Sequence, residues 1–215
     1  MTRYDQKMRL FAACLSAVAG YIDAIGFMES RGFFVSFMSG NSTRVGVEVV
    51  QGSSHGLVAA GLIVCFLLGV VGGSVAGHLA GRLRRAMVLV LVTVLLVGAA
   101  SFNARGIQAP AVALMAVAMG AENAVFTEDG EVRIGLTYMT GTLVKLGQGL
   151  SLALFGGPAL GWLPYFLLWF GLLLGAFAGA GAYQVFGLAA LWGAAALTLM
   201  LSAIAAQMAR GPGGA

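Results

Sequence analysis

Long apolar runs, separated by short polar or glycine-rich breaks, dominate the pattern of hydrophobic and polar positions along this chain. The runs cover residues 8–28, 57–80, 86–102, 110–126, 162–185 and 187–208. A helix needs about 17–25 mostly apolar residues to cross the hydrocarbon core of a bilayer. The pattern therefore predicts an all-α integral membrane protein with six transmembrane helices.

Two more polar stretches, residues 33–52 and 135–156, are also long enough to cross, so the number of spans depends on charge. Basic residues concentrate on the cytoplasmic side of membrane proteins. Six spans with a cytoplasmic N-terminus place the basic cluster at residues 82–85 inside, whereas eight spans place it outside. We therefore expect six spans, both termini in the cytoplasm, and a broken or re-entrant polar helix in each polar stretch.

The two polar stretches contain copies of one motif. FMSGNSTRVG at residues 37–46 matches YMTGTLVKLG at residues 138–147 in the aromatic, Met, small hydroxyl, Gly and basic positions. Further matches are Gly20 with Gly120, Asp23 with Asn123, and the triplet Gly69, Gly73, Gly77 with Gly171, Gly175, Gly179. The chain is thus interpreted as two three-span repeats, residues 1–107 and 108–215. Because three is odd, the second repeat is expected to be inverted relative to the first, as in many secondary transporters.

Composition excludes several other classes of protein. Of the 215 residues, 60% are hydrophobic and 9% are charged, which is too apolar for a water-soluble globule of this size. The net charge of +4 comes from residues scattered near span ends, so it indicates membrane orientation and not nucleic-acid binding. Cys14 and Cys65 lie in apolar runs and imply neither a disulfide nor a metal site, and no cofactor is implied.

Charged residues near the membrane plane are the first candidates for function. They are Asp23, Arg44, Glu48, Glu122 and Lys145. A charge left unpaired at the bilayer centre costs about 2.5–3.5 kcal/mol on insertion scales, so pairing is expected. The repeat suggests Asp23 with Arg44 and Glu122 with Lys145. Two hypotheses stay open and are compatible: structural clamps that tie each polar stretch to the preceding span, and groups that bind substrate, gate a cavity or relay protons.

Hydroxyl and amide side chains surround a glycine in each motif, namely Gly40 and Gly141. A glycine permits a helix break, and freed N–H groups at a break can bind an anion or a polar ligand. The alternative is that these groups satisfy one another at the broken helix ends. The complete candidate set for substrate binding or gating is Asp23, Ser39, Gly40, Asn41, Thr43, Arg44, Glu122, Asn123, Thr140, Gly141, Thr142 and Lys145.

Four segments carry a resemblance to a known family: AGYIDAIGF at 19–27, FVSFMSGNSTRVG at 34–46, MGAENAVF at 119–126 and TYMTGTLVKLG at 137–147. They resemble the YoaK-like family of bacterial membrane proteins, a family of unknown function. This resemblance covers nearly the whole chain; it implies a small six-span protein, and brings with it no substrate or catalytic residue.

A further segment, GHLAGRLRR at 77–85, carries a second resemblance. It is similar to the cytoplasmic loop between the second and third spans of major facilitator transporters. It departs from that pattern at Gly81, where the family has Asp, and at Arg84, where the family has Gly. The resemblance implies half of such a transporter, with two copies needed for a full pathway.

No paired-His metal motif, nucleophile elbow or phosphate-binding loop is present in the sequence, so we do not expect an enzyme. The leading hypothesis is a secondary transporter or exporter of a small polar or anionic solute in the bacterial inner membrane. A non-transporting scaffold or partner protein and a channel are the alternatives. The glycine faces also suggest a homodimer, because they let backbones approach closely.

Overall fold

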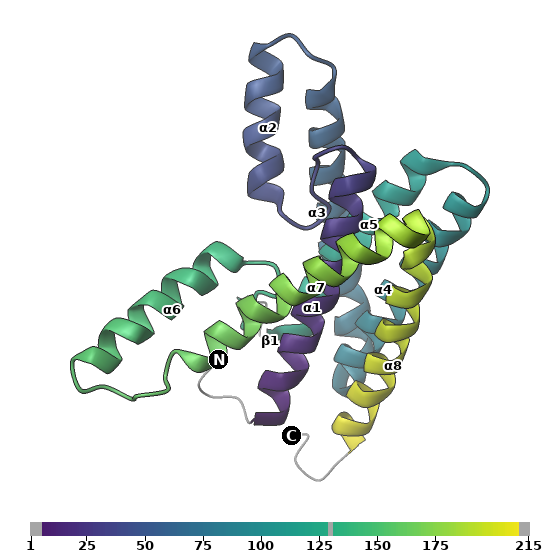
Figure 1. The fold of residues 1–215 in the computed structure, drawn as a ribbon. Helices are drawn as coiled ribbons and strands as arrows, with labels where there is room; N and C mark the ends of the chain where they lie inside the picture. Colours follow the sequence, from purple (N-terminus) through teal and green to yellow (C-terminus); the bar gives the residue numbers. More distant parts are fainter. Residues whose placement is uncertain (1–5, 129–130, 211–215) are drawn as a thin grey trace.

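The computed structural model describes residues 6–128 and 131–210, and these residues are almost entirely helical (Figure 1). The α-helices are α1 Gln6–Glu29, α2 Met38–Val50, α3 His55–Ala80, α4 Arg84–Ala104, α5 Gln108–Glu122, α6 Met139–Leu154, α7 Leu163–Phe186 and α8 Leu191–Arg210. Short 3-10 turns follow α3, α5 and α7: η1 Gly81–Leu83, η2 Asn123–Phe126 and η3 Gly187–Ala190. Two antiparallel two-residue strands, β1 Thr127–Glu128 and β2 Glu131–Val132, complete the described elements.

The apolar runs form the helices predicted from them. Four helical segments are long and apolar enough to cross a membrane: Gln6–Glu29, His55–Ala104, Gln108–Phe126 and Leu163–Arg210. The second and fourth contain 50 and 48 residues and are each divided by a 3-10 turn, into α3 with α4 and α7 with α8. Gly81 and Gly187 begin these turns with φ of +53° and +56°, a conformation that glycine adopts without a Cβ clash.

Glycines bring the helices of the two halves into close contact. A Cβ on Gly175 would meet the carbonyl oxygen of Ala17, so α7 lies against α1 with almost no side chain between them. In the same way, a Cβ on Gly69 would meet the carbonyl oxygen of Val117, which places α3 against α5. We call these two contacts the α1–α7 seam and the α3–α5 seam.

The seams correct the predicted match between the glycine triplets by one helical turn. Because Gly20 matches Gly120 in the repeat, Ala17 matches Val117. Gly69 lies against Val117 and Gly175 lies against Ala17, so Gly175 is the residue of the second half that corresponds to Gly69. The sequence had matched Gly69 with Gly171. Gly73 against Ala121 and Gly179 against Tyr21 give the same register. A glycine at every fourth residue looks alike after a shift of one turn, so the spacing alone could not fix the register.

Helices α2 and α6 are continuous, so a break at Gly40 or Gly141 is wrong, whereas the alternative of a re-entrant polar helix stays a prediction. Gly40 and Gly141 lie in the first turn of their helices, and the irregular backbone precedes α2 and α6. Figure 1 shows α2 beside the start of α3 and α6 beside the start of α7, and α2 and α6 project away from the rest of the molecule. A glycine in a first turn leaves the helix intact because later turns supply its hydrogen bonds.

The apolar core lies among α1, α4, α5 and α8. Leu15, Ile22, Leu89, Met115 and Leu191 are fully buried there. Many apolar side chains on α2, α3, α6 and α7 are exposed in contrast, as expected for surfaces that face lipid.

Candidate functional site

Asp23, near the end of α1, holds the segment that leads to α2. Its Oδ1 accepts hydrogen bonds from the backbone N–H groups of Val35, at 2.9 Å, and of Ser36, at 2.7 Å. Carboxylates bond strongly to such N–H groups, which would otherwise lie unpaired in a non-helical segment. Asp23 is therefore a structural clamp in this conformation.

Asn123 has the corresponding position in the second half. The hydroxyl of Thr137 donates to Asn123 Oδ1 at 3.1 Å, and Asn123 Nδ2 donates to the carbonyl of Met119 at 2.9 Å. Asn123 and Thr137 are both buried. In each half, a polar side chain at or near the end of the first helix thus holds the segment that leads into the repeated motif.

Other polar residues of the motifs bond within their own helix or loop. Asn41 is fully buried; its Oδ1 accepts from the N–H of Phe34 at 3.0 Å and its Nδ2 donates to the carbonyl of Phe34 at 2.7 Å. Thr142 donates to the carbonyl of Tyr138 at 3.1 Å, and Thr43 to that of Ser39 at 3.2 Å. These contacts favour the hypothesis that Asn41, Thr43 and Thr142 form hydrogen bonds within the protein and do not bind a ligand.

The two motif copies meet at one pocket, although they lie about half the chain apart. Residues 36–39 and 137–141, together with Phe66 of α3, line this pocket of about 300 Å³, which we call the motif pocket. In Figure 1, α2 and α6 both begin near the centre of the molecule and diverge from there. The structure therefore brings Ser39, Thr140 and Gly141 of the candidate set together.

The motif pocket has hydrogen-bond donors without protein acceptors. Among the described residues, the exposed hydroxyls of Ser39 and Thr140 make no hydrogen bond. Each lies in the first turn of its helix, where backbone N–H groups also have no partner within the helix. Helix N-termini carry partial positive charge, so two of them at one pocket favour an anionic or polar ligand.

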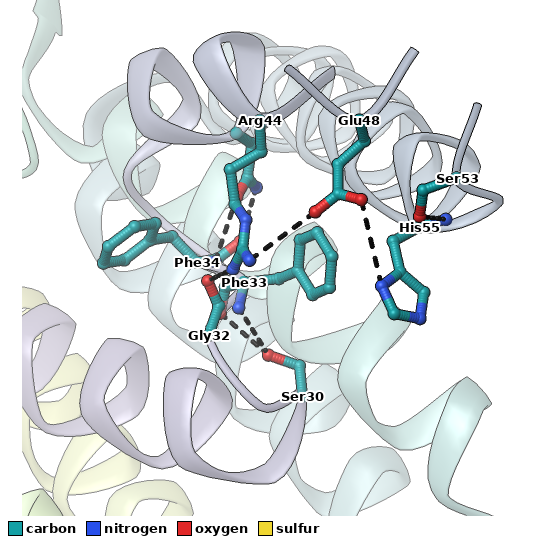
Figure 2. A network of polar contacts seen from close by, with 9 residues as sticks. Ser30, Gly32, Phe33, Phe34, Arg44, Glu48, Ser53 and His55 are labelled. Carbon is teal, nitrogen blue, oxygen red and sulfur yellow. Dashed lines mark hydrogen bonds and ion pairs between the residues drawn. The ribbon is translucent and has the colours of Figure 1, made fainter. Parts of the chain in front are cut away.

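Arg44 forms a separate network at the far side of the loop, shown in Figure 2. Its Nη1 donates to the carbonyl of Gly32, its guanidinium carbon lies 4.3 Å from the centre of the Phe33 ring, and its Nη2 lies 3.8 Å from Glu48 Oε1. The predicted pair of Arg44 with Asp23 is therefore wrong in this conformation. Glu48 is one helical turn from Arg44 on α2, which makes it the nearer partner.

His55 extends the Arg44 network to the start of α3. Its Nδ1 lies 3.9 Å from Glu48 Oε2, and its ring meets the Phe33 ring edge to face with centres 6.3 Å apart. Neither His55 nor Phe33 is among the candidate residues chosen from the sequence. The only available signal was that Glu48 and His55 flank a short turn between two helices.

Lys145 and Glu122 are also not partners in this structure. Lys145 is exposed on α6, and its Nζ lies 5.9 Å from the centre of the Tyr165 ring on α7. Glu122, at the end of α5, is fully buried, and neither carboxyl oxygen has a hydrogen-bond partner among the described residues. The predicted pair is wrong because α6 extends along α7, away from the core around α5. Gating by the two predicted charge pairs has no support in this conformation.

The described residues contain no group of three or more His, Cys, Asp or Glu side chains that could hold a metal ion. The motif pocket, the Arg44 network and buried Glu122 are three places in the described part of the chain where polar groups deviate from simple helix pairing.

Comparisons with known proteins agree with a membrane protein. A family model described as "Protein of unknown function (DUF1275)" matches residues 11–204. The UPF0700 transmembrane protein RA0705 of Rhizobium meliloti (strain 1021) is 38% identical over 200 residues, which are 92% of this chain and 86% of that protein. No solved structure matches the chain.

Proposed function

Because the chain belongs to the DUF1275 family, transmembrane proteins of unknown function, we propose from its own residues that it is a small secondary transporter of a polar or anionic solute. The observation that carries this proposal is the motif pocket. Two copies of one motif, one from each half, line a single pocket with the starts of α2 and α6. Transporters built from repeats bind substrate where the repeats meet, often at helix N-termini that face an anionic group.

We also propose six membrane crossings, arranged as two inverted repeats, residues 1–107 and 108–215, in the bacterial inner membrane. A straight helix rises 1.5 Å per residue, so a segment of 50 residues would be about 75 Å long, far more than a hydrocarbon core of about 30 Å. Division of that segment into α3 and α4, which pack together, supports two crossings. The paired α1–α7 and α3–α5 seams support the duplication.

Single cysteines test the orientation of this arrangement. In a background with Cys14 and Cys65 changed to Ala, we expect Ala104→Cys to react with an impermeant thiol reagent only from outside the cell. Leu83→Cys, in the basic turn between α3 and α4, is expected to react only from the cytoplasmic side, because basic turns stay inside. Reaction of both cysteines from the same side would contradict six crossings with cytoplasmic termini.

Flux into liposomes that contain the purified protein tests the transport proposal. The probes are labelled inorganic phosphate, small carboxylates and zwitterionic amino acids, each added alone. We expect saturable uptake of one class, and a fall of about tenfold in the double variant Ser39→Ala, Thr140→Val. The reason is that each hydrogen bond is worth about 0.5–1.5 kcal/mol, and about 1.4 kcal/mol corresponds to tenfold.

Ser42→Ala is the matched control for the double variant, since its exposed hydroxyl is on α2 but already donates to the carbonyl of Met38. Uptake by this control is expected to equal that of the unchanged protein. Equal uptake by the double variant would remove the motif pocket from the mechanism. Flux that never saturates would favour a channel, and no flux for any probe would favour a scaffold.

The homodimer stays a prediction, with a different physical basis. The seam glycines face helices of the same chain, so they are not free for a second copy. Exposed apolar side chains such as Leu57, Val64 and Leu68 on α3 offer a surface instead, and lipid can cover the same surface. Native mass spectrometry in mild detergent should show a dimer; monomer alone at every concentration would exclude it.

A further inference from the structure

A second pocket, apart from the motif pocket, lies where α1 ends and α3 and α5 begin. It has a volume of about 580 Å³, and Glu29, Arg31, Arg44 and His55 are among its polar lining residues. We call it the end pocket. Since α1, α3 and α5 belong to the membrane-spanning segments, a pocket at their ends lies at the level of the lipid headgroups.

The lining of the end pocket changes from polar to apolar with depth. Along α3, His55 stands at the first residue of the helix, and Val58, Leu62 and Cys65 follow at successive turns. Along α5, Gln108 stands at the first residue and Val112 lies one turn deeper. This order matches a molecule whose polar head stays at the surface while its apolar chain enters the membrane.

Among the described residues, Arg31 is a charged group of the end pocket that is free to bind a ligand. Its side chain is exposed and makes no hydrogen bond or ion pair with any described residue. Arg44, in contrast, is held by Gly32, Phe33 and Glu48, as Figure 2 shows. Arg31 also has a φ of +56°, a conformation that costs a residue with a Cβ some stability.

The end pocket is lined by two arginines, Arg31 and Arg44, and by one carboxylate, Glu29. Glu48, which is not part of the lining, lies next to Arg44, and this leaves Arg31 and Glu29 as a pair of opposite charges. Glu29 Oε2 accepts from the hydroxyl of Tyr183 at 2.7 Å, so its carboxylate is held in place. A free guanidinium and a fixed carboxylate in one pocket suit a headgroup that carries both a phosphate and an ammonium group.

We propose that the end pocket binds a phospholipid whose zwitterionic headgroup carries a primary ammonium, because its N–H groups can donate to the Glu29 carboxylate. Arg31 binds the phosphate, Glu29 faces the ammonium group, and one acyl chain lies against Val58, Leu62 and Val112. The proposal does not rest on transport, because the two pockets share no lining residue.

Native mass spectrometry of the protein released from nanodiscs tests this site. The nanodiscs contain equal amounts of phosphatidylethanolamine, phosphatidylglycerol and phosphatidylcholine. We expect phosphatidylethanolamine to be retained preferentially. Arg31→Gly should lower that retention about tenfold, the effect of losing one hydrogen bond to a charged group. Equal retention of the three lipids, or preferential retention of phosphatidylglycerol or phosphatidylcholine, would overturn the proposed headgroup.

Arg31→Gly also separates lipid binding from folding. Glycine adopts positive φ readily, so this variant should unfold at the same temperature as the unchanged protein or higher. Arg31→Lys keeps the charge and should keep most of the retention. The control is Arg105→Gln, an exposed basic residue in the turn before α5, which should keep all of it. Unchanged retention in Arg31→Gly would overturn the role of Arg31.

A final arm distinguishes a lipid from a free solute with the same polar group. Glycerophosphoethanolamine has the headgroup without acyl chains, and we expect millimolar amounts of it to leave the bound phosphatidylethanolamine in place. Displacement at that concentration would show that the headgroup alone fills the site, and the end pocket would then be a solute site and not a lipid site.

Discussion

Gly175→Ala should destabilise the protein strongly and lower its unfolding temperature. A Cβ at this position would meet the carbonyl oxygen of Ala17, which belongs to the backbone of α1 and cannot rotate away. Overpacking of this kind typically costs 1–3 kcal/mol, and we expect about 3 kcal/mol here because backbone would have to shift. That is a large share of a total stability of roughly 5–15 kcal/mol. Thermal unfolding and the yield of monodisperse protein in mild detergent measure the effect.

Gly181→Ala is the matched control, because it makes the same chemical change on the same helix. Nothing lies within 4 Å of a Cβ built at Gly181, so the new methyl group would occupy open space. This control should unfold at an equal or slightly higher temperature, since Ala is favoured over Gly in helices by about 0.5–1 kcal/mol. Gly69→Ala, in the α3–α5 seam, should resemble Gly175→Ala. If Gly175→Ala and Gly181→Ala unfold alike, the α1–α7 seam is not packed as described.

Glu122→Met should make the protein more stable. Both carboxyl oxygens of Glu122 are buried without a hydrogen-bond partner among the described residues, and a buried polar group of this kind costs about 1–3 kcal/mol by mutational measurements. Met has a similar length, no charge and a flexible side chain, so it should fill the same space. We expect a gain of about 1–3 kcal/mol, measured as a rise in unfolding temperature.

The first half of the chain supports this expectation. Ile22 occupies the position that matches Glu122 in the repeat and is likewise fully buried, so the fold accepts an apolar side chain there. Glu131→Gln, an exposed carboxylate in β2, is the control and should leave the unfolding temperature unchanged. A lower unfolding temperature in Glu122→Met would show that the carboxyl group has a stabilising partner. Stabilisation together with loss of flux would assign Glu122 to function, because ionisable residues inside membranes are rarely retained for stability.

The sequence alone predicted the positions of the six apolar helices to within a few residues. Apart from Trp162, which precedes α7, each apolar run lies within one described helical segment, because helix formation in an apolar run depends on neighbours along the chain and on the need to satisfy every backbone group in lipid. It also identified the repeated motif and the residues, such as Ser39 and Thr140, that line the motif pocket. The continuous form of α2 and α6 was missed, because a glycine in a first turn and a glycine at a break look the same in a sequence.

Only the tertiary structure decided which distant residues meet. Asp23 accepts hydrogen bonds from backbone N–H groups, and Arg44 lies near Glu48 on its own helix. Glu122 is buried without a hydrogen-bond partner among the described residues. Charge pairing follows from the reach of each side chain and the direction in which its helix leaves the bundle, and neither is encoded by matching positions in a repeat. The glycine seams had the same ambiguity, since a spacing of four residues repeats with every turn of the helix. The packing of whole helices resolved this ambiguity, because it places Gly69 against the backbone of α5 and Gly175 against the backbone of α1.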